Sequence, residues 1–335
     1  MINTSHPGTF SRAFVTPFLT LAAAAALLTM PAVSRAQTFP LYLTNATDST
    51  LERFTSGGVG TAFSTSGLNS PQDLVFDAAG NLYVANFNSN TIEKFTITAG
   101  VLSPTGTVFA NTGMNGPLGL AIDSAGDLYV GNFGGNSITK FAAAGGVPSN
   151  TPTTFATGVS QPFDLAFDLS GNLYASNQSA NTITKFTISG GVLSPSGTTF
   201  NLTALSGPTG LAFDLAGDLF VSNSGNNTIT KFTATGGVLS TSGVTYISTG
   251  LNGPAGLAFD SSGDLFAANI TNNSIEEYAA TGGVPSTTGT SFASGSPTVQ
   301  GPRFIALTPT PEPGSAMLLA LGAGAMLTWR RRRHA

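Results

Sequence analysis

The chain has 335 residues, of which 41% are apolar and only 8% are charged. It has no cysteine, which excludes disulfides, thiol nucleophiles and cysteine metal sites. A chain of this length can bury a core large enough to fold without cross-links. Residues 37–310 contain fifteen acidic and six basic residues, a formal charge of −9, which argues against a nucleic-acid partner.

The N-terminal stretch predicts export. Arg12 precedes an apolar run at residues 18–30, and Ser34-Arg35-Ala36 then offers small residues where an export peptidase reads the chain. We therefore predict a signal peptide over residues 1–36, cleaved by signal peptidase after Ala36. A retained membrane anchor is the alternative, although the run is short for a span.

One sequence unit recurs through the body of the chain. Six copies each open on a proline, and the prolines are separated by 46, 45, 46, 46 and 48 residues. These prolines are Pro71, Pro117, Pro162, Pro208, Pro254 and Pro302. A fixed period of this size is typical of a repeat architecture.

Each copy predicts four strands. In the copy that begins at Pro208, the apolar runs 211–213 and 219–221 flank the Gly-containing turn Asp214–Asp218, and further runs follow at 228–233 and 244–248. Four strands per period of about 40 to 50 residues indicate the blade of a β-propeller. The alternative, a β-solenoid, normally repeats in a much shorter rung.

The first and last copies are incomplete in complementary ways. Residues 41–45 align with the second strand at 82–86, and residues 51–54 align with the third strand at 92–95, so the first copy lacks its opening strand. The last copy, Pro302–Leu307, is an opening strand alone. The predicted fold is thus an all-β, six-bladed propeller over residues 37–308, with strands at about 41–68 and at 302–308 sharing one blade and closing the ring.

The repeat has a sequence pattern similar to that of a known group of proteins. The pattern P-x-G-L-A-F-D-x-x-G-D-L-Y-V-x-N-x-x-x-N-x-I-x-K-F resembles the NHL repeat and the related YVTN and SMP-30-like six-bladed propellers over residues 41–308. This resemblance implies the fold. It leaves the function open, because propellers include enzymes, binding modules and scaffolds.

Residues 309–335 differ in composition from the repeats. Pro311, Glu312 and Pro313 precede an apolar segment at 314–329 and four arginines at 330–333. This order resembles a PEP-CTERM sorting signal. The resemblance implies a Gram-negative source, transient anchoring in the inner membrane, processing by an exosortase, and delivery to the cell surface or extracellular matrix. A plain C-terminal membrane anchor is the alternative.

Catalytic chemistry finds little support in the repeats. The only histidines, His6 and His334, lie outside them, which removes mechanisms that depend on histidine. The prediction therefore includes no catalytic residue and no cofactor.

Several polar positions recur in the repeats and predict structural roles. Aspartates precede the Gly-containing turn and are expected to cap it through the backbone. They are Asp77, Asp123, Asp168, Asp214 and Asp260. Asparagines end the second strand in all six copies and are expected to tie neighbouring loops together. They are Asn45, Asn86, Asn132, Asn177, Asn223 and Asn269.

Positions that vary between copies are the candidates for function. The residue after each opening proline is expected to ring one mouth of the central channel, where SMP-30-like lactonases carry metal ligands. These residues are Gln72, Leu118, Phe163, Thr209, Ala255 and Arg303. In the next ring, Asp73 and Asp164 are candidate ligands for a hard cation. The alternative is a pair of solvated carboxylates, one of them paired with Arg303.

The loops between second and third strands are expected to rim the same mouth with carboxamides, hydroxyls and the rings of Phe87 and Phe133. Such groups suit the hydroxyls and apolar faces of a polysaccharide. The candidate ligand residues are Gln72, Phe87, Asn88, Phe133, Phe163 and Arg303. The alternative is that tight turns simply require Asn and Gly.

These observations predict a non-catalytic binding protein of the cell surface or matrix, associated with exopolysaccharide. One alternative is a divalent-metal-dependent hydrolase or lactonase of the SMP-30 type, which needs at least three oxygen ligands converging in the channel. A second alternative is a protein-interaction scaffold, which needs an exposed apolar patch larger than about 400 Å².

Overall fold

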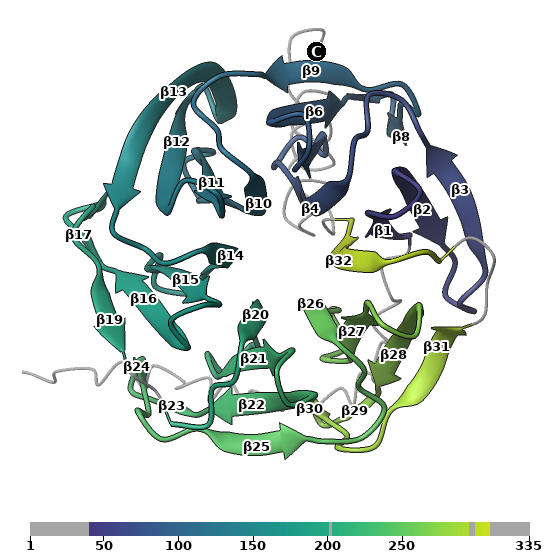
Figure 1. Cartoon of the computed structure of the whole chain (residues 1–335), viewed down its shortest axis with the longest axis vertical. Helices are drawn as coiled ribbons and strands as arrows, with labels where there is room; N and C mark the ends of the chain where they lie inside the picture. Colours follow the sequence, from purple (N-terminus) through teal and green to yellow (C-terminus); the bar gives the residue numbers. More distant parts are fainter. Residues whose placement is uncertain (1–39, 201–202, 295–298, 309–335) are drawn as a thin grey trace, which may run out of the picture. The chain divides into compact units, whose positions relative to one another are not determined.

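The computed structural model describes residues 40–200, 203–294 and 299–308, and these residues form strands and turns. Six four-stranded sheets surround a common axis (Figure 1), which confirms the predicted six-bladed β-propeller. The predicted signal peptide with Ala36, and the predicted sorting signal with Pro311, Glu312 and Pro313, lie outside these residues. Among the residues described, no helix is long and apolar enough to cross a membrane.

Four antiparallel strands run from the axis to the rim of each blade, and blades are numbered 1 to 6 by their second strands in chain order. The first strands, from blade 1, are β32 (Pro302–Leu307), β4 (Pro71–Phe76), β10 (Pro117–Ile122), β14 (Pro162–Phe167), β20 (Pro208–Phe213) and β26 (Pro254–Phe259). The second strands are β1 (Leu41–Asn45), β5 (Leu82–Asn86), β11 (Leu128–Asn132), β15 (Leu173–Asn177), β21 (Leu219–Asn223) and β27 (Leu265–Asn269).

The two outer strands complete each sheet. The third strands are β2 (Thr50–Phe54), β6 (Thr91–Phe95), β12 (Ser137–Ala144), β16 (Thr182–Phe186), β22 (Thr228–Phe232) and β28 (Ser274–Tyr278). The fourth strands are β3 (Gly60–Ser64), β9 (Thr107–Ala110), β13 (Val147–Thr157), β19 (Thr198–Phe200), β25 (Val244–Ile247) and β31 (Thr290–Ser294).

Blade 1 closes the ring as predicted. Its strand order is β3-β2-β1-β32, so three strands come from the start of the described chain and one from its end. Leu41 pairs with Leu307, and Leu43 pairs with Ile305. The inner strand β32 also lies against β26 on one side and β4 on the other. Closure therefore leaves no inner strand without a neighbour.

The core lies between adjacent blades. All five residues of every second strand are buried, because both faces of each blade pack against a neighbour. Between blades 3 and 4, for example, Tyr129 shares a cluster with Leu173 and Phe186. This packing explains the short, almost continuous apolar runs in the repeat.

Small hairpins between third and fourth strands are a feature that the sequence did not predict. Four blades carry a separate two-stranded hairpin, and in blade 3 the hairpin continues β12 and β13. The separate hairpins are β7–β8 (Ile97–Thr98, Val101–Leu102), β17–β18 (Ile188–Ser189, Val192–Leu193), β23–β24 (Ala234–Thr235, Val238–Leu239) and β29–β30 (Ala280–Thr281, Val284–Pro285).

Each hairpin folds onto the turn between first and second strands of its own blade. The Asp218 carboxylate accepts a bond of 2.7 Å from the Ala234 amide. Aspartate accepts the same bond in blades 3 and 6, and the side-chain oxygen of asparagine accepts it in blades 2 and 4. In blade 3 the approach is close enough that a Cβ at Gly126 would lie 2.4 Å from the Gly146 carbonyl oxygen. We call this side of the ring, with its turns and hairpins, the hairpin face.

The turn aspartates cap their turns as predicted. In blade 5, Asp214 Oδ1 accepts bonds of 2.9 Å from the backbone amides of Ala216 and Asp218. The same pair of bonds occurs at the turn aspartates of blades 2, 3, 4 and 6. Because the same bonds occur in five blades, these carboxylates have a structural role.

Candidate functional site at the channel mouth

The opposite side of the ring, which we call the mouth face, carries the loops between second and third strands at residues 46–49, 87–90, 133–136, 178–181, 224–227 and 270–273. The asparagines that end the second strands lie beneath these loops. Each accepts a backbone bond from the residue two positions before an opening proline, as when Asn86 Oδ1 accepts the Asn69 amide at 3.1 Å. The prediction that they tie loops together is confirmed.

A second set of polar side chains on this face joins neighbouring blades. The last loop residue has a positive φ in every blade, and its side-chain oxygen accepts the amide before the opening proline of the next blade. Asn227 (φ 54°) binds the Gly253 amide at 2.7 Å. The equivalent acceptors are Ser49, Asn90, Asn136, Asn181 and Asn273.

These rim oxygens are therefore engaged in the fold. Asparagine suits the position because its short amide tolerates the left-handed conformation and can bond locally. The bonds favour the interpretation that turn geometry explains the asparagine-rich rim. Asn88, one residue into its loop, is also exposed but is not one of these interblade acceptors.

The ring of residues after the opening prolines is largely buried. Gln72, Leu118, Phe163, Thr209 and Ala255 are at most 5% exposed, and Arg303 is half-buried. The Gln72 amide donates to the Ser70 carbonyl and hydroxyl at 3.1 Å. Five of the six positions predicted to ring the mouth thus pack inside it.

Aromatic rings from opposite blades meet at the axis. Phe163 of blade 4 stacks on Phe304 of blade 1, with ring centroids 5.8 Å apart and 30° between planes. Leu118, Phe163, Ala255 and Phe304 belong to one buried cluster. Since the two rings come from blades on opposite sides, they close the channel at this level.

One alternative from the sequence was that Asp73 and Asp164 are solvated and that one of them pairs with Arg303. This alternative is wrong. Both are buried, and they make no ion pair. Asp73 accepts the amides of Leu74 and, from the next blade, Leu120, at 2.7 and 2.6 Å. Asp164 binds two backbone amides in the same way, one of them from blade 5.

The two carboxylates sit in an unfavourable electrostatic environment. Burial and the nearby Asp164 raise the pKa of Asp73 well above its usual range, and burial raises the pKa of Asp164 to about 7. Where the equivalent residue is glycine, the inner strands approach directly: a Cβ at Gly210 would lie 2.2 Å from the Ala255 carbonyl oxygen. The carboxylate bonds and the close glycine contacts both join neighbouring blades. The carboxylates therefore act as bridges between inner strands.

The described part of the chain does not bring together a set of acidic or histidine ligands for a metal ion. Across residues 40–200, 203–294 and 299–308, no three His, Asp or Glu side chains are placed to hold a metal ion. Asp73 and Asp164 contribute two carboxylates, and both already bind amides. Calcium needs several more oxygen ligands than these two groups offer.

What remains accessible is a sector of the mouth formed by blades 1 to 4. Phe87 and Phe133 are half-buried, with centroids 6.4 Å apart, and Phe133 lies 6.4 Å from Phe163. With the stacked Phe163–Phe304 pair, they make a continuous run of four rings from the rim to the axis. We group with these rings the exposed Asn88, which follows Phe87 in the chain, and the half-buried Arg303, which precedes Phe304, and call these residues the mouth sector.

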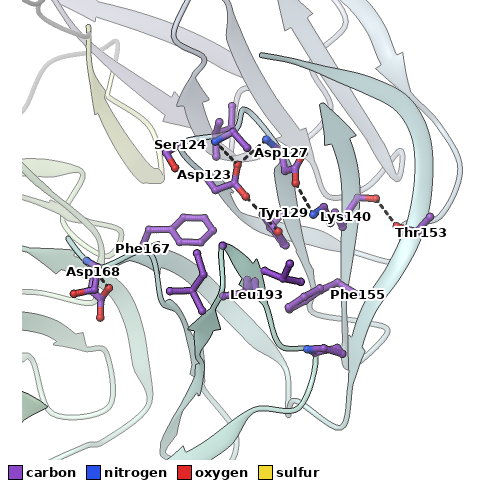
Figure 2. Close-up of a pocket in the computed structure, with 18 of the residues that line it drawn as sticks. Asp123, Ser124, Asp127, Tyr129, Lys140, Thr153, Phe155, Phe167, Asp168 and Leu193 are labelled. Atoms are coloured by element: carbon purple, nitrogen blue, oxygen red, sulfur yellow. Dashed lines mark hydrogen bonds and ion pairs between the residues drawn. The ribbon is translucent and has the colours of Figure 1, made fainter. Parts of the chain in front are cut away.

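The structure also reveals a hollow on the hairpin face that the sequence did not indicate. It encloses about 600 Å³ between blades 3 and 4 (Figure 2). The Tyr129, Phe155 and Phe167 rings and the Asp123, Asp127 and Asp168 carboxylates are among its lining groups. A second hollow of about 380 Å³ lies beside Leu307 and Thr308, on the same face.

The charged groups in the first hollow make structural contacts that recur in other blades. Lys140 pairs with Asp127 and lies 5.2 Å from the centre of the Tyr129 ring. Blades 4 and 5 repeat the arrangement with Lys185 and Lys231. Lysine in this place therefore clamps the third strand to the turn below, and the same motif in three blades argues against a dedicated active site.

Exposed valines are a further feature of the hairpin face. One lies at the hairpin of each of blades 2 to 6, and Val59 lies in the shorter turn of blade 1. They are Val59, Val101, Val147, Val192, Val238 and Val284, all between 37% and 70% exposed. Leu169 and Leu215 add exposed apolar groups in the turns beside them.

Comparison with known proteins defines the relationship at the level of fold. No family model and no curated protein sequence matches the chain. A structure of the nidogen/laminin complex matches with a TM-score of 0.62 and 17% identity, over 79% of this chain and 97% of that one. Virginiamycin B lyase from Staphylococcus aureus matches with a TM-score of 0.56 and 16% identity, over 80% and 85%.

A third similar structure is a putative gluconolactonase, with a TM-score of 0.51 and 15% identity, over 67% of this chain and 77% of that one. The shared feature is the six-bladed β-propeller. These propellers include enzymes and a non-enzyme, so the likeness assigns no activity. For the lyase, a variant with a histidine changed to alanine is described as catalytically inactive.

Proposed function

We propose that this propeller is an exported, non-catalytic binding protein of the cell surface or extracellular matrix, sorted by an exosortase and associated with exopolysaccharide. The observation that carries the proposal is the mouth sector. There, aromatic rings and an exposed amide lie together, while most polar groups around them are occupied by the fold. Rings that stack on sugar faces beside a few hydrogen-bonding groups are a common arrangement for carbohydrate recognition.

The mouth sector supplies a defined set of ligand contacts. Phe87 and Phe133 offer apolar surface, Asn88 offers both a donor and an acceptor, and Arg303 offers donors only. Phe163 and Gln72 lie beneath them and shape the floor. Direct contact with a ligand is therefore assigned to four of the six candidate ligand residues, and a supporting position to the other two.

A hydrolase or lactonase is less well supported. The described repeats contain no histidine, and the lyase with the same fold is described as inactive without one of its own. Hydrolysis through a metal needs several ligands held together, and no three His, Asp or Glu side chains come together for this in the described part of residues 40–308.

The position of Thr308, the last residue described, suggests how a tethered protein would be oriented. Strand β32 ends on the hairpin face, where the Thr308 amide donates to the Pro40 carbonyl at 3.4 Å. A protein tethered through residues 309–335 is therefore expected to keep its mouth face away from the membrane. Protease treatment of intact cells tests this orientation, and preferential cutting in the hairpins would contradict it.

Binding is tested with exopolysaccharide purified from the producing organism and the full-length protein. We expect retention of the protein on the immobilised polysaccharide, and weaker retention of F87A/F133A. The matched control is V101A/V238A, which removes two exposed apolar groups from the hairpin face. Equal retention of both variants would place the contact outside the mouth sector, and no retention of the unmodified protein would reject the association.

The exposed valines favour a second candidate, a protein-interaction scaffold that uses the hairpin face. A repeated apolar group on a face with few charges is typical of a protein contact surface. Replacement of the five hairpin valines by threonine should abolish co-purification of a partner after cross-linking in cells. Unchanged co-purification would reject this candidate without affecting the first.

A further inference from the structure

Arg303 breaks the symmetry of the mouth. Of the six residues after the opening prolines it is the one charged side chain, whereas Gln72, Leu118, Phe163 and the other two are neutral. It is half-buried on β32, directly before Phe304, which stacks at the axis. Its Nε atom is buried and has no hydrogen-bond partner among the residues that the structure describes.

Within residues 40–200, 203–294 and 299–308, no carboxylate forms an ion pair with Arg303. Asp73 and Asp164, the partners that the sequence suggested for Arg303, bind backbone amides of leucines instead. Burial alone lowers the pKa of the Arg303 guanidinium, and no acidic group raises it. A guanidinium partly removed from water without a counter-ion is unfavourable, so this position costs the free protein stability.

A ligand can supply the missing partner. The planar guanidinium matches a carboxylate through two parallel N–H···O bonds. One cation without a second basic group nearby suits a singly charged carboxylate better than a doubly charged phosphate. The aromatic run that ends at Phe87 and Phe133 offers a platform for the sugar ring that would carry such a carboxylate.

We propose that Arg303 is the anchor for the carboxylate of an acidic polysaccharide, which lies across Phe87 and Phe133. This inference rests on the proposed function and names its ligand class. The formal charge of −9 for residues 37–310 opposes a polyanion at long range. Recognition is therefore local, through one desolvated ion pair per site, and differs from the many-contact binding of a basic surface.

The test compares native exopolysaccharide from the producing organism with the same material after its carboxyl groups are reduced to alcohols. Full-length protein, R303Q and R53Q are titrated against each. Arg53 is the matched control, because it is an exposed arginine of the same blade and its replacement changes the net charge equally. We expect R303Q to bind native polysaccharide about tenfold or more weakly, and R53Q to bind like the unmodified protein.

The remaining outcomes separate the two proposals. Binding of native but not reduced polysaccharide, lost in R303Q, supports the inference. Equal binding of native and reduced polysaccharide keeps the proposed function and overturns the assignment of an acidic ligand. Equal effects of R303Q and R53Q overturn the role of Arg303. Competition by inorganic sulfate at the molar concentration of polysaccharide carboxylate would assign a free oxyanion site and overturn the glycan assignment. Absence of binding to both materials rejects the proposed function and the inference together.

Discussion

The two faces of the ring differ in how closely they follow the sixfold repeat. On the hairpin face, the same turn, the same hairpin bond and the same exposed valine recur from blade to blade. Towards the mouth, equivalent inner positions hold Asp73, Gly119, Asp164, Gly210, Gly256 and Phe304. Repetition there ends because side chains from different blades compete for one shared space at the axis. Departures from symmetry are therefore where a specific role should be sought.

The largest effect is expected where inner strands approach most closely. G210A places a Cβ 2.2 Å from the Ala255 carbonyl oxygen, a backbone atom that cannot move aside. We expect a loss of at least about 3 kcal/mol in the free energy of unfolding, measured by urea denaturation. G131A is the control, since the nearest atom to its added Cβ lies at 3.5 Å and equivalent strands carry Ala85 and Ala268. Similar losses for both variants would contradict the close-packing argument.

The free energy of unfolding should depend on pH because carboxyl groups are buried towards the mouth face. Burial raises the pKa of Asp164 and of Glu93 to about 7. The folded protein then holds protons that the unfolded chain has already released, so the free energy of unfolding falls as pH rises from about 4 to 7. We expect a decrease on the order of a few kcal/mol between those values, measured by urea denaturation at each pH.

A substitution at Glu93 separates its contribution to this pH dependence from that of the other buried carboxyl groups. Its Oε2 atom is buried and has no hydrogen bond to any described residue, while the equivalent Thr139 and Thr230 each donate to a loop carbonyl. E93T should therefore stabilise the protein at pH 8 by on the order of 1–2 kcal/mol and flatten its pH profile. An unchanged slope between pH 4 and 7 would mean that Glu93 does not titrate in this range.

A smaller loss is expected at the joints of the mouth rim. N227A removes the acceptor for the Gly253 amide and places alanine at a φ of 54°. We expect a loss of about 1–2 kcal/mol, seen as a lower melting temperature. N227G separates the two causes, because glycine accepts this φ without strain. If N227G is as destabilised as N227A, the hydrogen bond accounts for the whole effect.

The smallest effect is expected on the hairpin face. V101T changes a side chain that is 70% exposed and should alter the free energy of unfolding by less than about 0.5 kcal/mol. V84T makes the same change at a fully buried position of the same blade and should cost about 1–3 kcal/mol. A clear loss in V101T, measured by thermal denaturation, would show that the valine packs against another part of the protein.

Local chemistry made most of the fold predictable. The opening prolines gave the period, the Asp-to-Asp turns gave the hairpin between first and second strands, and the incomplete end copies predicted the closure seen at β1 and β32. Turn caps and asparagine ties were predictable because each bond joins residues at a fixed spacing along the repeat. The small hairpins were not, because their two-residue strands leave little periodic signal.

The centre of the ring could not be predicted in the same way. Phe163 and Phe304 are far apart in the sequence and belong to different repeats, so no periodicity reports that they stack. The burial of Asp73 and Asp164 follows from that packing, which is why the sequence placed them in solvent. The exposed valines were visible in the sequence, but a valine after glycine in a repeat also suits a buried strand.

The pairing of β1 with β32 has a mechanical consequence. The described chain enters blade 1 at Leu41 and leaves it at Leu307, and these two residues are partners at one end of the same ladder. A pulling force applied to the two chain ends would load that terminal pair first and then each following pair in turn, as in the opening of a zipper. Such a force would thus be resisted by one residue pair at a time, and the β1–β32 seam would part before any other blade.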